Sequence, residues 1–170
     1  GRHIPFQVLP FSFSEFLRAR KFPPDEPIAP KERHGMMLHL LDEYISTGGY
    51  PEVVAQGADP RNYLSTLFES ILFKDIVKRH NIRHASKLHD LGRYLISNHS
   101  RDFSYTSLKN ALNFNSVHTI ETYAACLEEA FLLFSTDRYS TKLKEQMRSP
   151  KKAYAYDSGM INAVKFRLSP

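Results

Sequence analysis

Apolar residues recur every three or four positions over two long stretches in the first half of the chain. This spacing lines one helical face, so it predicts helices over residues 31–47 and 60–79. Gly48 and Gly49 end the first helix, because glycine adopts the left-handed geometry of a helix C-terminus at low cost. Asp59 is a candidate N-cap for the second helix, since its carboxylate can accept a hydrogen bond from a free backbone amide of the first turn.

The N-terminal segment carries local signals of other kinds. Ser12 followed three positions later by Glu15 matches a capping box and predicts a short helix over residues 13–20. Loose alternation from Ile4 to Leu9 predicts a short strand. Residues 22–30 hold four prolines, whose missing amide donors exclude helix and indicate a stiff linker.

The second half of the chain predicts helices, an extended turn and two strands in a definite order. The expected elements are helix 86–97, extended residues 103–105, helix 108–112 capped by Thr106–Ser107, helix 116–130, strand 131–134 and strand 152–156. This is the order of a winged helix, a helix-turn-helix variant with an added β-hairpin. We therefore expect a mainly α fold with a small β-hairpin, made of a helical linker bundle and a winged-helix domain.

Helix 116–130 divides into an apolar stripe and a face that carries hydroxyl and imidazole groups. In winged helices the helix at this place enters the major groove of DNA by its N-terminal end. The side chains expected to reach phosphates and base edges are Ser116, His118, Thr119 and Thr122. The alternative is that residues 116–130 form an ordinary core helix.

The segment between the two expected strands is basic. Its cations expected to contact phosphates are Arg138, Lys142, Lys144 and Arg148, and Lys151 and Lys152 follow them. Glu145 is the one acidic residue among these positions. A basic hairpin beside a recognition helix indicates double-stranded DNA as the partner, whereas an ordinary solvated loop is the alternative.

Composition narrows the classes of protein. The net charge of +5 over 170 residues is a mild basic bias, so where the charge lies matters more than its sum. Cys126 is the single cysteine, which excludes a disulfide framework and fits a reducing cytoplasm. Its place beside the apolar stripe of helix 116–130 indicates packing. The longest apolar run is too short to span a bilayer, so we expect no membrane partner.

The sequence lacks two common motifs of enzymes. It has no GxxxxGK(S/T) phosphate-binding loop and no HExxH metal-binding motif. His80, His84 and His89 are four and five residues apart, a spacing that does not hold one helical face, so no metal site is expected. A nuclease needs clustered acids, and only Asp157 stands near a strand end. We expect this chain to hold no cofactor and to be non-catalytic alone.

Short stretches spread over nearly the whole chain carry a further signal. They are Gly1–Arg2, Leu9–Leu17, Glu43–Ile45, Gly48–Val54, Lys74–Arg79, Tyr94–Leu95, Leu127–Leu133, Leu143–Gln146 and Lys151–Gly159. In this order they resemble prokaryotic AAA+ ATPases of uncharacterised role. The resemblance points to a family more than to an activity, because the family's own activity is poorly defined.

The resemblance implies a longer parent protein, and both ends of the chain read as cut. A P-loop domain would precede Gly1 and a restriction-endonuclease-like domain would begin near Tyr156, so ATP and Mg²⁺ are implied for the parent. The expected regions are 1–30, tail of the AAA+ core and linker; 31–82, helical linker or lid; 83–156, winged helix; and 157–170, start of the next domain. Arg2 would match an arginine that senses the nucleotide's terminal phosphate, although a solvated surface arginine is the simpler interpretation.

Two functions remain open on the sequence. The first is a winged-helix DNA-binding region of an AAA+ ATPase, which contacts duplex phosphates with its recognition helix and basic wing. The second is a protein-interaction or self-association domain of the same ATPase. The second function would show an exposed apolar patch around Tyr123, Phe134 and Tyr139 without a continuous basic surface.

Overall fold

The apolar stripes of several helices meet in one core. The computed structural model describes residue 4, residues 6–22 and residues 29–165, and it is mostly helical with a small three-stranded antiparallel sheet. The fully buried side chains at the centre are Leu64, Phe68, Leu72, Leu88, Leu91, Ile120, Leu127 and Leu133. The predicted fold class, mainly α with a small β element, is confirmed.

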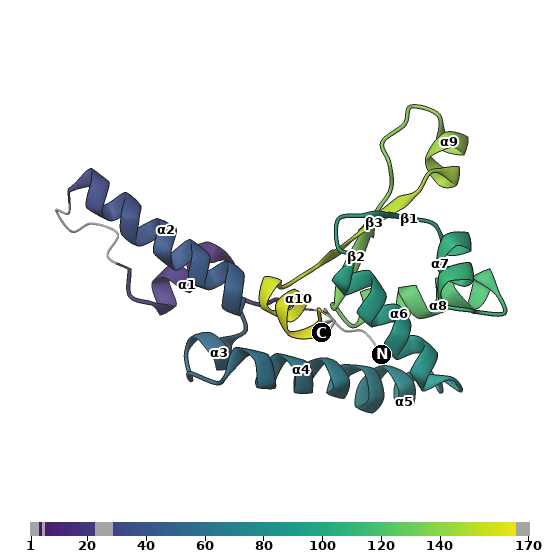
Figure 1. Cartoon of the computed structure of the whole chain (residues 1–170), viewed down its shortest axis with the longest axis horizontal. Coiled ribbons are helices and arrows are strands. Elements are labelled where there is room, and N and C mark those ends of the chain that lie inside the picture. The colour runs from purple at the N-terminus through teal and green to yellow at the C-terminus, as the bar shows by residue number, and fades with distance from the viewer. Residues whose placement is uncertain (1–3, 5, 23–28, 166–170) are drawn as a thin grey trace, which may run out of the picture.

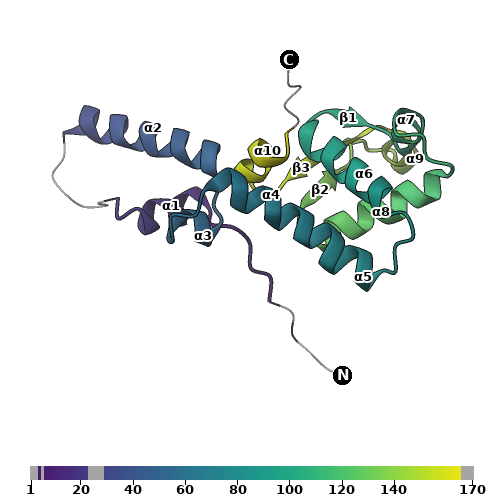
Figure 2. The same ribbon diagram turned by 60° about the horizontal axis from the view of Figure 1, so that its bottom comes forward.

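Helices α1 (Phe13–Ala19) and α2 (Pro30–Thr47) form an arm that projects from the rest of the molecule (Figures 1 and 2). The predicted capping box begins α1, because Ser12 N donates to Glu15 Oε2 at 2.8 Å and Ser12 Oγ accepts from Glu15 N. Phe16 of α1 is buried, with its ring centroid 5.2 Å from that of Tyr44 in α2. No residue of α2 itself is buried.

The segment before α1 differs from the prediction. Residues 6–9 form no strand, and the side chains of Phe6 and Val8 are exposed. The predicted strand from Ile4 to Leu9 is therefore wrong over its described part, because no described strand pairs with it. Arg2 and the proline-rich residues 23–28 lie outside the described residues.

A helical run of three elements begins after the short helix α3 (Pro51–Val54). It consists of α4 (Pro60–Ser70), the π-helix η1 (Ile71–Ile76) and α5 (Val77–Arg79). As predicted, Asp59 is the N-cap, and its Oδ1 accepts from Asn62 N at 2.8 Å. The run ends at Arg79 as expected, but it is not α-helical throughout.

The π-helical turn follows from the spacing of the buried residues. Leu64, Phe68, Leu72 and Ile76 repeat every four residues, whereas an α-helix has 3.6 residues per turn. Each four-residue step in an α-helix therefore rotates the stripe by about 40° away from the core. A wider π turn absorbs part of this drift and keeps Ile76 buried.

The remaining elements alternate between helices and the sheet. They are α6 (Ala85–Ser97), β1 (Asp102–Phe103), α7 (Tyr105–Ala111), α8 (Val117–Glu129), β2 (Leu133–Thr136), α9 (Leu143–Arg148) and β3 (Lys151–Ala155). Strand β3 lies between β1 and β2 and is antiparallel to both. Leu133 pairs with Ala155 at one end of the β2–β3 hairpin, and Thr136 pairs with Lys152 near its tip.

Two details of this region correct the sequence interpretation. Helix α7 begins at Tyr105 because Ser104 caps it, and Ser104 Oγ accepts from Ser107 N at 3.1 Å. The expected cap at Thr106–Ser107 is therefore two to three residues too late. The basic segment inside the hairpin is also not a plain loop, since it contains α9.

Helix α10 (Ser158–Val164) joins the arm to the core. It packs against α2, α4 and α6, so residues 158–164, expected to open a further domain, lie against the elements before them. Ser158 Oγ donates to Tyr44 O at 3.1 Å, and Asn162 Nδ2 donates to Ile45 O and Ser46 O at 3.0 Å each. Tyr44 O also accepts from Gly48 N at the C-cap of α2, and Asn162 supplies a donor to the last-turn carbonyls of Ile45 and Ser46.

Asp157 is the polar centre of this junction. Its carboxylate is buried, Oδ2 accepts from Gly49 N at 2.7 Å, and Oδ1 accepts from Met160 N at 2.8 Å. Burial raises the pKa of the Asp157 carboxyl, while the backbone donors oppose that shift. Gly49 is thus held to the N-cap of α10 across more than a hundred residues of sequence.

Candidate nucleic-acid interface

Helix α8 presents different chemistry on its two sides. Ile120, Ala124 and Leu127 are buried, which follows from their spacing of four and three residues. On the opposite side His118 and Thr122 are exposed, and the side chain of His118 is 88% exposed. Two of the four side chains predicted to face outward on this helix, His118 and Thr122, are therefore exposed.

The exposed face of α8 also carries an acid that sequence analysis left out. Glu121 Oε2 lies 3.9 Å from His118 Nδ1, three residues along the helix. Thr122 Oγ1 donates to His118 O at 2.9 Å, so its lone pairs remain available to an outside donor. Glu121 therefore adds a carboxylate to the exposed face that carries His118 and Thr122.

Ser116 and Thr119 are half-buried at the start of α8. Thr119 borders a hollow of about 300 Å³ that also includes His84, Asn113 and Asn115. Lys87 in the wall of this hollow donates to Leu112 O at 2.6 Å and lies 5.4 Å from the Phe114 ring centroid. Lys87 therefore fixes the turn between α7 and α8 from α6.

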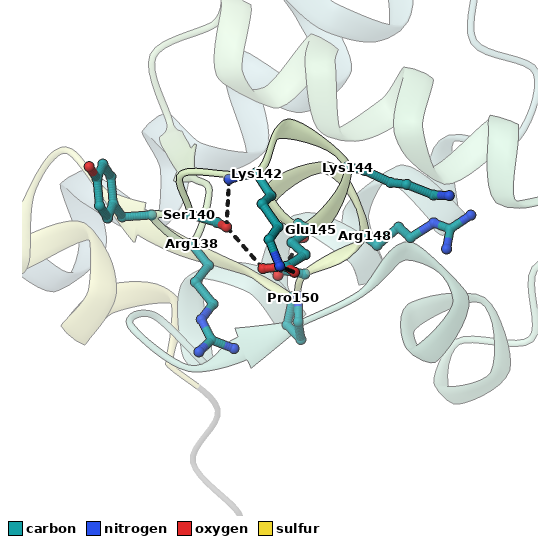
Figure 3. Close-up of a pocket in the computed structure, with 9 residues that line it drawn as sticks. Arg138, Ser140, Lys142, Lys144, Glu145, Arg148 and Pro150 are labelled. Carbon is teal, nitrogen blue, oxygen red and sulfur yellow. Dashed lines mark hydrogen bonds and ion pairs between the residues drawn. The ribbon is translucent and has the colours of Figure 1, made fainter.

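The β2–β3 hairpin supplies the basic part of the candidate interface, which we call the wing (residues 137–150). A hollow of about 560 Å³ is lined by residues of the wing, Arg138, Lys142 and Arg148 among them (Figure 3). Glu145 accepts from Ser140 Oγ at 3.1 Å and pairs with Lys142 Nζ at 3.1 Å. The one acid inside α9 is therefore compensated within the wing.

The other cations in the wing and at the start of β3 differ in their partners. Lys151 pairs with Asp137, and this hydrogen bond raises the pKa of the lysine. Arg138, Lys144 and Arg148 are exposed and form no ion pair with any described residue. Lys144 and Arg148 are four residues apart on α9, and Figure 3 shows their side chains extending in the same direction.

The predicted residues from α8 and from the wing lie in one part of the molecule. Figures 1 and 2 show α7 and α8 at the end opposite to the α2 arm, and Figure 1 shows α9 on the hairpin that projects from this end away from α8. A ligand that meets both the exposed face of α8 and the cations of α9 must therefore span the separation between these helices that Figure 1 shows. Tyr123, in contrast, is buried with its ring 6.0 Å from that of Phe114, so it contributes to no exposed apolar patch.

Other candidate chemistry is not assembled in the described part of the chain. His89 Nε2 lies 2.9 Å from Glu69, His80 Nε2 lies 3.4 Å from Glu129, and His84 borders the hollow at Thr119. Among the described residues no group of three His, Cys, Asp or Glu side chains has metal-binding geometry. Cys126 is buried, and burial raises the pKa of its thiol, as expected for a packing residue.

Comparison with known proteins places the chain in a family. Residues 38–169, which include the interface and the Asp157 junction, match the model of a domain of unknown function, DUF8612. The chain belongs to the DUF8612 family. No solved structure matches it. Within the described residues 4, 6–22 and 29–165, this chain has no helix with the length and apolarity needed to cross a bilayer.

Two curated relatives extend over a longer chain. An uncharacterized protein of Haemophilus influenzae is 28% identical over 165 residues, covering 94% of this chain and 39% of its own length. An uncharacterized protein of Methanocaldococcus jannaschii is 30% identical over 168 residues, covering 95% of this chain and 37% of its own length. The chain thus spans less than two-fifths of the relatives it matches.

Proposed function

We propose that this DUF8612 chain is a winged-helix region that binds double-stranded DNA, with α8 as the recognition helix and the β2–β3 hairpin as the wing. The order α6–β1–α7–α8–β2–β3 and the sheet order β1–β3–β2 support this proposal. Winged helices add a hairpin of this kind to the helix-turn-helix.

One observation carries the DNA proposal more than the others. Lys144 and Arg148 are exposed side by side on α9, have no acidic partner among the described residues, and lie on the hairpin at the same end of the molecule as α8. Unpaired cations on a projecting hairpin are suited to phosphates, which supply most of the non-specific affinity for DNA. His118 and Thr122 would then lie toward the groove, where short polar groups can reach base edges.

For the whole protein we propose an ATP-driven assembly of the AAA+ class in the cytoplasm, with this region as its DNA-contacting part. The sequence resemblance supports this proposal, and so does the greater length of both curated relatives. ATP and Mg²⁺ would bind outside residues 1–170. A P-loop in the coding sequence upstream of Gly1 would support this parentage, and a continuous reading frame without one would exclude it.

Charge reversal on the wing tests the DNA proposal. The double variant Lys144→Glu/Arg148→Glu is expected to weaken binding to a labelled 20-base-pair duplex about tenfold at low salt, because two phosphate contacts become repulsive. Fluorescence anisotropy measures the affinity.

The control for charge reversal changes the same charge at the same spacing elsewhere. Lys74 and Lys78 are exposed, lie four residues apart on the η1–α5 segment and are remote from the wing in sequence and fold. Lys74→Glu/Lys78→Glu should leave the affinity within about twofold of the original. Equal losses in the two double variants would exclude the wing as the DNA contact.

A further inference from the structure

The wing exposes large apolar side chains as well as cations. Tyr139 is 88% exposed, Leu143 is 70% exposed and Met147 is 76% exposed. Leu143 and Met147 are four residues apart on α9, so they form a stripe on one helical face. The Lys144–Arg148 pair has the same spacing and begins one residue later, so the basic stripe lies about 100° around the helix from the apolar one.

A flush DNA duplex leaves this apolar stripe unexplained. The outer surface of a duplex offers phosphates and sugars, and its grooves offer base edges, while the base faces are stacked inside. Burial of an exposed leucine, methionine or tyrosine side chain is favourable only against an apolar or aromatic surface. Phosphate contacts account for Lys144 and Arg148, but not for Leu143, Met147 or Tyr139.

The charges of the wing select the kind of occupant. Both acids of the segment are paired, Asp137 with Lys151 and Glu145 with Lys142. The remaining charge is positive, so the occupant should be anionic next to an uncharged flat surface. An unpaired nucleotide has both parts, because its phosphate is an anion and its base has a free π face.

We propose that the wing engages unpaired nucleotides at the point where a duplex opens, so that the preferred ligand is forked DNA. This inference rests on the proposed DNA-binding function and names the substrate class for it. The face of α8 would hold the duplex, the Lys144–Arg148 stripe would hold phosphates at the fork, and Leu143, Met147 and Tyr139 would contact the first unpaired bases. Apolar side chains act in this way in other proteins when they insert beside unstacked bases.

Binding to three labelled DNAs of equal duplex or strand length tests the inference. The DNAs are a flush duplex, a duplex with two unpaired thymidine arms, and a single strand. The whole chain is expected to bind the fork about fivefold more tightly than the flush duplex, since stacking on one base contributes at least that factor. The variant Tyr139→Ser/Leu143→Ser/Met147→Ser should lose this preference while its flush-duplex affinity stays within about twofold.

The variants distinguish DNA binding in general from a preference for forked DNA. The three serine changes lie at exposed positions, so the variant should keep the original far-UV circular dichroism and melting temperature. Lys144→Glu/Arg148→Glu should weaken binding of fork and flush duplex alike. The fluorescence of a 2-aminopurine at the first unpaired position of the fork should change on binding of the original chain and stay unchanged with the serine variant.

Each other outcome has a definite meaning. Equal affinity for fork and flush duplex overturns the fork inference and leaves the DNA-binding proposal standing. Absence of binding to all three DNAs overturns the proposed function and the inference with it. Binding to phosphatidylserine vesicles that the serine variant loses, with the fork preference unchanged in that variant, assigns the apolar stripe to a lipid surface and overturns the inference.

Discussion

Gly159→Ala is expected to lower the free energy of unfolding by about 3 kcal/mol, because the α10 junction has no room for a methyl group. A Cβ at this position would lie 2.2 Å from Thr47 O, 2.5 Å from Thr47 C and 2.8 Å from Gly48 N. All three atoms belong to the backbone at the end of α2, so no flexible side chain can move aside. Urea unfolding followed by circular dichroism measures the change.

Gly35 provides the matched control for Gly159. It lies in the exposed middle of α2, and nothing comes within 4 Å of an added Cβ. Gly35→Ala should raise the free energy of unfolding by about 0.5–1 kcal/mol, since alanine restricts the unfolded chain and favours helix. A Gly159→Ala protein as stable as the original would show that α10 does not dock on α2 as described.

Asp157→Asn is expected to cost about 2 kcal/mol of stability, because the two carboxylate oxygens accept from different backbone donors. Asparagine keeps one acceptor oxygen, and its side-chain NH2 group faces the backbone N–H of either Gly49 or Met160. One buried N–H is then left without an acceptor. Thermal and urea unfolding at fixed pH measure the loss.

Asp59 serves as the control for Asp157, since it is also a helix N-cap that accepts one backbone amide, from Asn62. It is not among the buried polar residues, and asparagine is an equally good N-cap, so Asp59→Asn should change stability by less than about 0.5 kcal/mol. Similar losses in the two variants would contradict a special role for the buried junction.

The pH dependence of the Asp157→Asn effect follows from the raised pKa. Burial makes the folded chain hold the Asp157 proton more tightly than the unfolded chain, in which the ordinary pKa is near 3.8. The stability that this protonation adds is fully present below the unfolded pKa and is lost as the pH rises through the folded pKa. The deficit of Asp157→Asn should therefore be largest in acid and should shrink toward neutral pH.

Local signals in the sequence predicted most of the helices. The Ser12–Glu15 capping box and the Asp59 cap lie where expected, because each needs only residues within one helical turn. The stripe of α8 fixed its buried side, and with it the exposure of His118 and Thr122. These elements depend on periodicity and capping, which a single sequence carries.

Features that depend on distant partners were not predictable in the same way. Asp157 read as an acid near a strand end, and its role depends on Gly49, which is far away in sequence. Its position before Ser158 and Gly159 does match an N-cap, so the start of α10 was open to prediction while its packing partner was not. The strand expected from Ile4 to Leu9 was wrong because a strand needs a pairing partner that local alternation does not reveal.

The wing was predicted from the sequence only in part. Its positive charge was evident, but α9 was missed because six residues give too short a pattern to distinguish a helix from a loop. The spacing of Leu143 with Met147 and of Lys144 with Arg148 is the signal that was available. The folded hairpin shows which cations have an acidic partner. Lys142 pairs with Glu145 and Lys151 pairs with Asp137.

The salt dependence of duplex affinity tests the central claim most directly. If Arg138, Lys144 and Arg148 each contact one phosphate, a plot of log affinity against log salt should have a slope of about −2.7, which is a loss of about 40-fold between 50 and 200 mM. The variant Lys144→Glu/Arg148→Glu should reduce the slope to about −1. A chain that binds no duplex at 50 mM salt, or whose slope is unchanged by this variant, contradicts DNA binding through the wing.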